Sequence, residues 1–143
     1  MRAPDFFSAG DRQRIADSVS AAESLTSSEI RVFIDDKCKG DPVEKAAWVF
    51  QKLGMEKTRD RNAVLLYLAM EDHCFAVFGD TGVYERLGQT YWDDLGLKMQ
   101  AEFRAGRFTD GIIAGLSELG MRLRDHFPKK QDDTNELPDA PAF

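Results

Sequence analysis

The stretch that decides the fold runs from Asn62 to Asp80, NAVLLYLAMEDHCFAVFGD. Its first part, residues 63–70, is a continuous apolar run, which is typical of a central strand covered on both faces of a sheet. A short polar break, residues 71–73, separates this run from a second apolar segment, residues 74–79. Because the connection is so short, the two segments are predicted to form an antiparallel hairpin.

The segments before this hairpin extend the sheet. Residues 29–34, EIRVFI, are predicted to form a strand, and the best helix start in the chain follows it. Asp41 is a candidate N-cap, Pro42 suits the first helical position, and Gly54 ends the helix. A strand, a helix and a strand in this order imply two parallel strands joined by a right-handed crossover. The sequence therefore predicts a mixed sheet, with a parallel βαβ unit and an antiparallel hairpin strand.

The remaining segments favour helices on both sides of this sheet. Apolar residues at helical spacing predict helices over 8–25, 83–88, 91–105 and 109–126. The large aromatic residues Trp92, Phe103 and Phe108 are expected in the core. The fold class that follows is α/β: a three-layer α/β/α sandwich with a mixed central sheet, Rossmann-like. We expect a single domain over residues 8–128 and a polar C-terminal tail over residues 129–143.

Composition narrows the classes of function. The chain has 143 residues, of which 43% are hydrophobic and 31% charged, as expected for one globular domain. Its formal net charge of −6 disfavours nucleic acid, which needs a basic face, and is compatible with cations. The longest apolar run is far shorter than the roughly 20 residues of a membrane span, and the N-terminus lacks an apolar signal region. We therefore expect a cytoplasmic protein without a membrane span.

The predicted topology brings three polar residues to one edge of the sheet. Glu29 lies at the start of the first strand, Asn62 at the start of the second, and Asp80 directly after the third, which runs the other way. Side chains with oxygen atoms from three separate segments are what a hard cation such as Ca²⁺, or else Mg²⁺, requires. The loop that carries Arg59 and Arg61 borders the same edge.

Structural roles are open for the same residues. Asp80 can cap the helix that follows it, Glu29 can be a solvated residue at a strand start, and Asn62 can be a turn residue. The Asp80-Thr81-Gly82 triplet also occurs in aspartic proteases. Those enzymes need two such triplets on an all-β fold, whereas this α/β chain has one copy.

A series of segments resembles one known family. "TSSEIRVFI", "FQKLGMEKTRDRNAVLLYLA", "FAVFGDTGVYERLG", "YWDDL", "FRAGRFTDGIIAGL" and "HFPKKQDDTNELPD" together are similar to the TPM domain. This family includes thylakoid photosystem-repair proteins, a nematode receptor regulator and bacterial proteins, and the likeness is closest to the stand-alone bacterial branch. Ser28 and Ala63 stand where glycine is common in the family.

The resemblance implies a three-layer α/β/α sandwich and two activities. Members have been described as binding calcium, and the plant members as acid phosphatases. By motif match, the implied metal ligands are Glu29, Asn62 and Asp80.

Three hypotheses follow. The first is a divalent-cation site for Ca²⁺ at Glu29, Asn62 and Asp80. The second is a metal-assisted phosphomonoester hydrolase, in which Asp80 is the nucleophile or general base and Arg59 or Arg61 holds the phosphate. The third is a module that binds a protein partner without catalysis.

Overall fold

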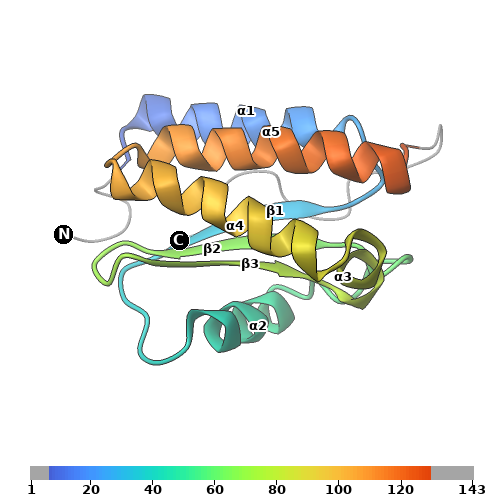
Figure 1. Cartoon of the computed structure of the whole chain (residues 1–143), viewed down its shortest axis with the longest axis horizontal. Coiled ribbons are helices and arrows are strands. Elements are labelled where there is room, and N and C mark those ends of the chain that lie inside the picture. The colour runs from blue at the N-terminus through green and yellow to red at the C-terminus, as the bar shows by residue number, and fades with distance from the viewer. Residues whose placement is uncertain (1–6, 130–143) are drawn as a thin grey trace.

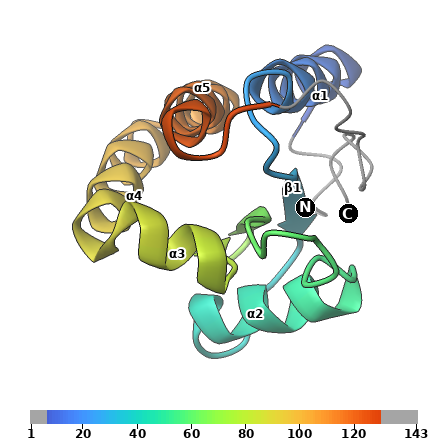
Figure 2. The same ribbon diagram turned by 90° about the vertical axis from the view of Figure 1, so that its right-hand side faces the viewer.

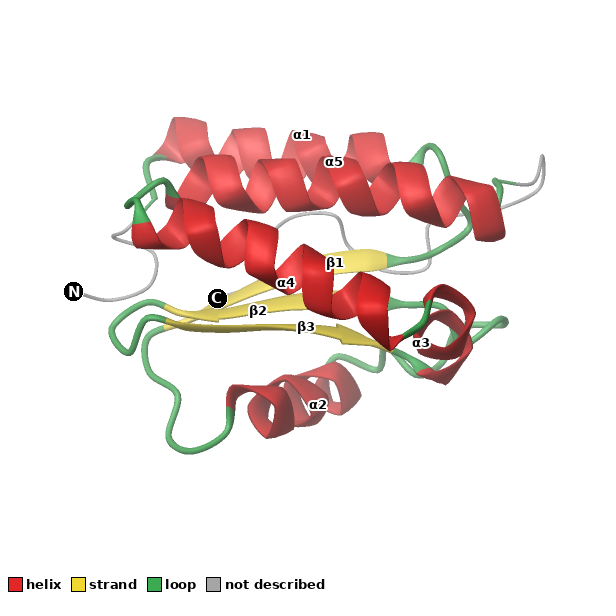
Figure 3. Ribbon diagram, viewed as in Figure 1, coloured by secondary structure: helices red, strands yellow, loops and turns green. Residues whose placement is uncertain are grey.

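The computed structural model describes residues 7–129, in which helices surround one sheet (Figure 3). The elements follow in the order α1 (Ala9–Glu23), β1 (Ile30–Asp35), α2 (Pro42–Lys52), β2 (Val64–Ala69), β3 (Cys74–Gly79), α3 (Thr81–Leu87), α4 (Gln89–Arg104) and α5 (Phe108–His126). Every predicted element is present, and most bounds move by one or two residues. Most of the predicted tail, residues 130–143, lies outside the described residues.

The three strands form the mixed sheet that the sequence predicts. Their order is β1-β2-β3, with β1 parallel to β2 and β3 antiparallel to it. In register, Ile30 lies beside Val64, and Val64 lies beside Gly79. The start of β1, the start of β2 and the end of β3 therefore share one edge of the sheet, and the hairpin turn lies at the other.

The sheet is the middle layer of a sandwich. Helices α1, α4 and α5 cover one face and α2 covers the other, while α3 lies at one end (Figures 1 and 2). Alternate residues of β2 supply the two cores. Val64, Leu66 and Leu68 belong to the cluster beneath α1, α4 and α5, whereas Leu65, Tyr67 and Ala69 pack on the α2 side. None of these side chains exceeds 2% exposure, which explains the continuous apolar run in the sequence.

Side-chain caps fix where the first two helices begin. The Ser8 hydroxyl accepts a hydrogen bond from the Asp11 amide at 3.0 Å, and the Asp41 carboxylate accepts one from the Val43 amide at 2.9 Å. Each cap satisfies an amide that has no partner within its helix. Pro42 occupies the first turn of α2, where its missing N–H costs no hydrogen bond.

Close packing holds α4 on α5. A Cβ atom on Gly115 of α5 would lie 2.7 Å from the Met99 sulfur of α4, so a larger residue would make this side chain shift. The contact sets the position of α4, whose C-terminal end forms one wall of a cavity near the hairpin turn. Within residues 7–129, no helix is long and apolar enough to cross a lipid bilayer.

Candidate functional site

The edge of the sheet opposite the hairpin carries the three residues selected from the sequence. The Val64 amide donates to the Glu29 carbonyl at 2.8 Å, and the Asp80 amide donates to the Ala63 carbonyl at 3.0 Å. These hydrogen bonds extend both strand pairings by one residue, so Glu29, Ala63 and Asp80 form one row across the three strands. Asn62 precedes Ala63. We call Glu29, Arg61, Asn62 and Asp80 the polar edge.

Three of the four residues of the polar edge are buried. Glu29 is 5% exposed, Asn62 2% and Asp80 4%. Carboxylates are rarely removed from water to this degree unless they are paired or bind an ion. The burial of Glu29 excludes the alternative that it is a solvated residue at a strand start.

Asp80 has two kinds of partner. Arg61 forms a bidentate ion pair with it, with Nε donating to Oδ2 at 2.7 Å and Nη2 donating to Oδ1 at 2.9 Å. The Thr81 amide also donates to Oδ1 at 2.7 Å, so Asp80 is the N-cap of α3. This cap explains why the helix begins two residues earlier than predicted. The hydrogen bonds to Asp80, and then its charge, raise the pKa of Arg61.

The backbone around Arg61 locks this pair in place. Arg61 has a positive φ of 51°, a conformation that residues other than glycine seldom adopt. Its carbonyl accepts hydrogen bonds from the amides of Gly82, at 2.9 Å, and Val83, at 3.3 Å. A Cβ atom on Gly82 would lie 2.7 Å from that carbonyl oxygen, so the approach requires glycine. Gly82, the second glycine of the Gly-Asp-Thr-Gly segment, thus leaves room for the loop that carries Arg61.

Neutral side chains that carry oxygen atoms lie in the segments that lead into β1 and β2. Asn62 donates through Nδ2 to the Ser27 hydroxyl at 3.3 Å, which directs its Oδ1 elsewhere. The hydroxyls of Ser28 and Thr58 are buried and have no hydrogen-bond partner among residues 7–129. A buried hydroxyl without a partner is unfavourable, and a ligand that accepts its lone pair removes that cost.

A small polar cavity of about 220 Å³ lies beside Glu29. Glu23, at the end of α1, also lines it, together with Ser28 and Lys129. Glu23 is 6% exposed and accepts a hydrogen bond from the Ile30 amide at 2.8 Å. The sequence analysis did not single out Glu23. The available signal was its position directly after the buried stripe of α1, which ends at Ala22.

The structure shows where the two candidate phosphate-binding arginines lie, but it does not test their role. Arg59 is exposed on the loop beside the polar edge, and the guanidinium of Arg61 binds the carboxylate of Asp80. Within residues 7–129, no group of three or more His, Cys, Asp and Glu side chains is placed to share a metal ion. A cation at this edge would therefore use the carboxylates of Glu29 and Asp80 together with neutral oxygen atoms.

The chain is similar to known proteins in sequence and in fold. The model of the TPM domain matches residues 2–122. The chain belongs to the TPM domain family. A comparison with curated proteins gives no match.

Solved TPM-type structures have the same fold. The solution structure of the BA42 protein from Bizionia argentinensis is 36% identical, with a TM-score of 0.90, over 96% of this chain and 94% of that one. The N-terminal domain of a protein from P. gingivalis is 15% identical, with a TM-score of 0.71, over 85% and 79% of the two chains. The N-terminal domain of the cg2496 protein from Corynebacterium glutamicum is 19% identical, with a TM-score of 0.60, over 81% and 73%. The last two likenesses concern the fold alone.

Proposed function

We propose that this TPM domain binds a Ca²⁺ ion at the polar edge, with Glu29, Asn62 and Asp80 as ligands. One observation carries the proposal. Two carboxylates, each no more than 5% exposed, lie in the same cross-strand row on either side of Ala63. Two buried carboxylates on the same face of a sheet favour a bound cation, because a nearby positive charge stabilises the ionised form of each.

The spacing of this row suits an ion. Positions two strands apart are separated by roughly 10 Å between Cα atoms. Side chains at these two positions rise from the same face of the sheet, and carboxylates on flexible side chains can both reach a Ca²⁺ ion above the row, with ligand bonds of about 2.3–2.6 Å. Ala63, between them, has a side chain too small to occupy the space.

The kind of donor atom indicates both the metal and its affinity. All candidate ligands are oxygen atoms, which favours Ca²⁺ and Mg²⁺ over zinc. Mg²⁺ demands stricter octahedral geometry, whereas Ca²⁺ tolerates a mixed set of carboxylate, amide and hydroxyl oxygens. Because only two ligands carry charge, we expect a dissociation constant in the range of about 0.1–1 mM, as for weak extracellular calcium modules.

Arg61 acts as the counterion of Asp80 when no metal is bound. Its side chain is 50% exposed, so the guanidinium can move into solvent while Asp80 turns to the ion. The ion and Arg61 therefore compete for the same carboxylate. Replacing Arg61 by Ala removes a side chain that competes for Asp80 and a positive charge that repels the ion. We therefore expect Ca²⁺ to bind about tenfold more tightly.

Calorimetric titration of Ca²⁺ into metal-free protein tests the proposal. We expect saturable binding by the wild-type chain, loss of binding in Asp80→Asn and tighter binding in Arg61→Ala. Asp110→Asn, which removes an exposed carboxylate on α5, serves as the matched control and should bind like the wild type. The absence of both heat and a thermal shift at millimolar Ca²⁺ would contradict the proposal.

A further variant locates the ion. Glu23 and Glu29 both line the small polar cavity, so Ca²⁺ could in principle use that pair instead. If Glu23→Gln abolishes binding while Asp80→Asn leaves it intact, the ion lies in the cavity and the Glu29–Asp80 row is not its site. The phosphatase hypothesis, which comes from the family resemblance, and the hypothesis of a protein-binding module both stay predictions.

A further inference from the structure

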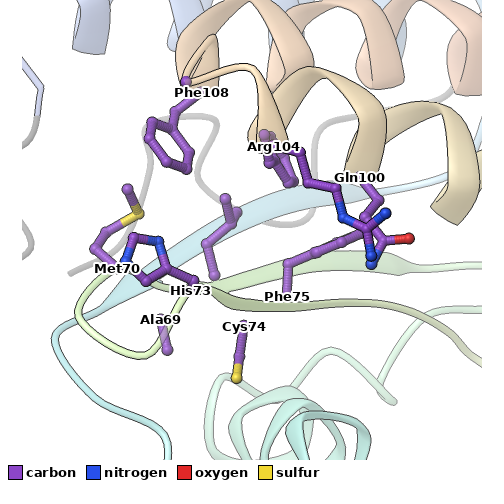
Figure 4. A pocket seen from close by; sticks show the side chains of 11 residues that line it. Ala69, Met70, His73, Cys74, Phe75, Gln100, Arg104 and Phe108 are labelled. Carbon is purple, nitrogen blue, oxygen red and sulfur yellow. The ribbon is translucent and has the colours of Figure 1, made fainter.

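A larger cavity, of about 710 Å³, lies next to the hairpin turn, at the opposite ends of the strands from the polar edge (Figure 4). The hairpin supplies Met70, His73 and Phe75, the end of α4 supplies Phe103 and Arg104, and the start of α5 supplies Phe108. Its volume is in the range of pockets that hold small organic molecules, roughly 300–1,000 Å³. We call it the hairpin cavity.

Three aromatic rings form an apolar wall of this cavity. The Phe75 and Phe103 rings meet edge to face, with centroids 4.9 Å apart, and the Phe103 and Phe108 rings are stacked at 5.8 Å. All three are only partly buried against the core, so the wall keeps apolar surface in contact with water. Covering such surface is favourable for any ligand with an apolar body.

Among the polar side chains that line the cavity, which include His73 and Gln100, Arg104 is the permanently charged donor. Arg104 is exposed in the last turn of α4 and makes no hydrogen bond or ion pair with another residue of the described chain. By contrast, Arg14, Arg61 and Arg107 each contact a carboxylate. The Gln100 amide also borders the cavity, near Arg104 in Figure 4.

The charge of the lining is opposite to that of the chain. The protein has 25 Asp and Glu residues and a formal net charge of −6, yet no described residue that lines this cavity is acidic. Cys74 adds no negative charge, because burial raises the pKa of its thiol. An unpaired guanidinium beside an apolar wall therefore selects an anion that also has an apolar part.

We propose that the hairpin cavity binds a small organic carboxylate with an aromatic or aliphatic body. Arg104 holds the carboxylate as a bidentate partner and Gln100 donates a further hydrogen bond. The body of the ligand lies against Phe75, Phe103 and Phe108. This site is independent of the polar edge, which lies at the other end of the strands.

Two probes and their neutral counterpart test the ligand class. Calorimetry with 4-phenylbutyrate and with decanoate measures binding of an aromatic and an aliphatic acid, and 4-phenylbutanamide keeps the aromatic body without the charge. We expect saturable binding of at least one acid and about tenfold weaker binding of the amide, because hydrogen bonds to charged groups are stronger than neutral ones. Equal binding of acid and amide, or no binding of either acid at millimolar concentration, would overturn the proposal.

A matched pair of arginine variants tests the residue. Arg104 and Arg124 are both exposed arginines in the last turn of a helix. Arg124 also lies 3.8 Å from Asp125, but this pair is exposed, so its loss should cost little. We expect Arg104→Gln to weaken the acid about tenfold and Arg124→Gln to leave it unchanged. Thermal unfolding of both variants confirms that they are folded. Equal binding by the two variants would remove Arg104 from the site and overturn the proposal.

Discussion

The two ends of the sheet hold their charged residues in opposite ways. At the polar edge, Asp80 is buried and Arg61 binds it with two hydrogen bonds. At the hairpin end, Arg104 is exposed beside three aromatic rings and has no partner in the described chain. A ligand at the polar edge must displace an existing partner, whereas a ligand in the hairpin cavity fills a place that is open.

The carboxylates at the two ends also have different hydrogen-bond donors. Asp35, at the end of β1, accepts a hydrogen bond from the hydroxyl of Tyr67 at 3.0 Å. Its counterpart Asp80 is held by a guanidinium. The hairpin end therefore uses a neutral donor where the polar edge uses a charged one. Under the cation proposal, only the polar edge would exchange one positive charge for another.

Among variants that disturb only one end of the sheet, Gly82→Ala is expected to change the stability most. The new Cβ would collide with the backbone that presents Arg61, so the loop must move away from α3. We expect a loss of stability of about 3 kcal/mol, at the upper end of the range for overpacked sites. Urea unfolding measures it.

Gly96→Ala is the control for this change. It adds the same methyl group on α4, where nothing lies within 4 Å, and should stabilise the helix by about 0.5–1 kcal/mol. If both variants have the same stability, the close contact between Gly82 and the loop does not matter, and the account of how Arg61 is positioned is wrong.

A smaller effect is expected at the other end from Tyr67→Phe. Removing the hydroxyl deletes its hydrogen bond to Asp35 and should cost about 1 kcal/mol at neutral pH. Burial, and then the hydrogen bond to Asp35, raise the pKa of Tyr67 above its ordinary value. A raised pKa gives stability that is complete below the unfolded-state pKa of about 10 and is lost as the pH rises above it.

Urea unfolding at neutral pH and near pH 10.5 checks both parts. The wild-type chain should lose more stability on going to alkaline pH than the Phe variant, because the variant has no phenol at this position to ionise in the unfolded state. An identical alkaline loss in the two proteins would show that Tyr67 is not the group responsible.

The smallest effect is expected on the surface, from Asp110→Asn. Asp110 pairs with Arg14 at 3.2 Å, but their side chains are 58% and 54% exposed. Exposed pairs contribute little because water and salt screen them, so we expect a change of less than about 0.5 kcal/mol. A loss as large as that of Tyr67→Phe, measured in the same urea series, would mean that this surface pair links α1 and α5 more strongly than its exposure indicates.

Much of the fold could be predicted from local patterns in the sequence. The apolar run in β2 and the short break after it determine the hairpin, and the caps at Asp41 and Ser8 determine two helix starts. Topology then places Glu29 and Asp80 at one edge, because a strand that runs backwards must end where its neighbours begin.

The details of the polar edge could not be predicted in this way. The pairing of Arg61 with Asp80 depends on the left-handed turn at Arg61 and on its contact with Gly82, which no periodic pattern contains. The burial of Glu23 depends on where the end of α1 meets β1.

The hairpin cavity shows a second limit of sequence patterns. Trp92, Phe103 and Phe108 were all expected in the core, and Trp92 is buried there at 7% exposure. Phe103 and Phe108 are only partly buried, because they lie at the join of α4 and α5, where the helices separate from the hairpin. Apolar spacing shows that a residue faces inward, but it does not show where a layer ends.

The most direct test of the cation proposal is a Ca²⁺ titration of ¹⁵N-labelled protein followed by amide chemical shifts. The account predicts saturable shifts at residues 28–30, 61–63 and 80–82, with Arg61 among the most affected because it leaves Asp80. It predicts no shifts around the hairpin cavity, at residues 70–75 and 104–108. No shifts at about 5 mM Ca²⁺, or shifts concentrated away from the polar edge, would contradict it.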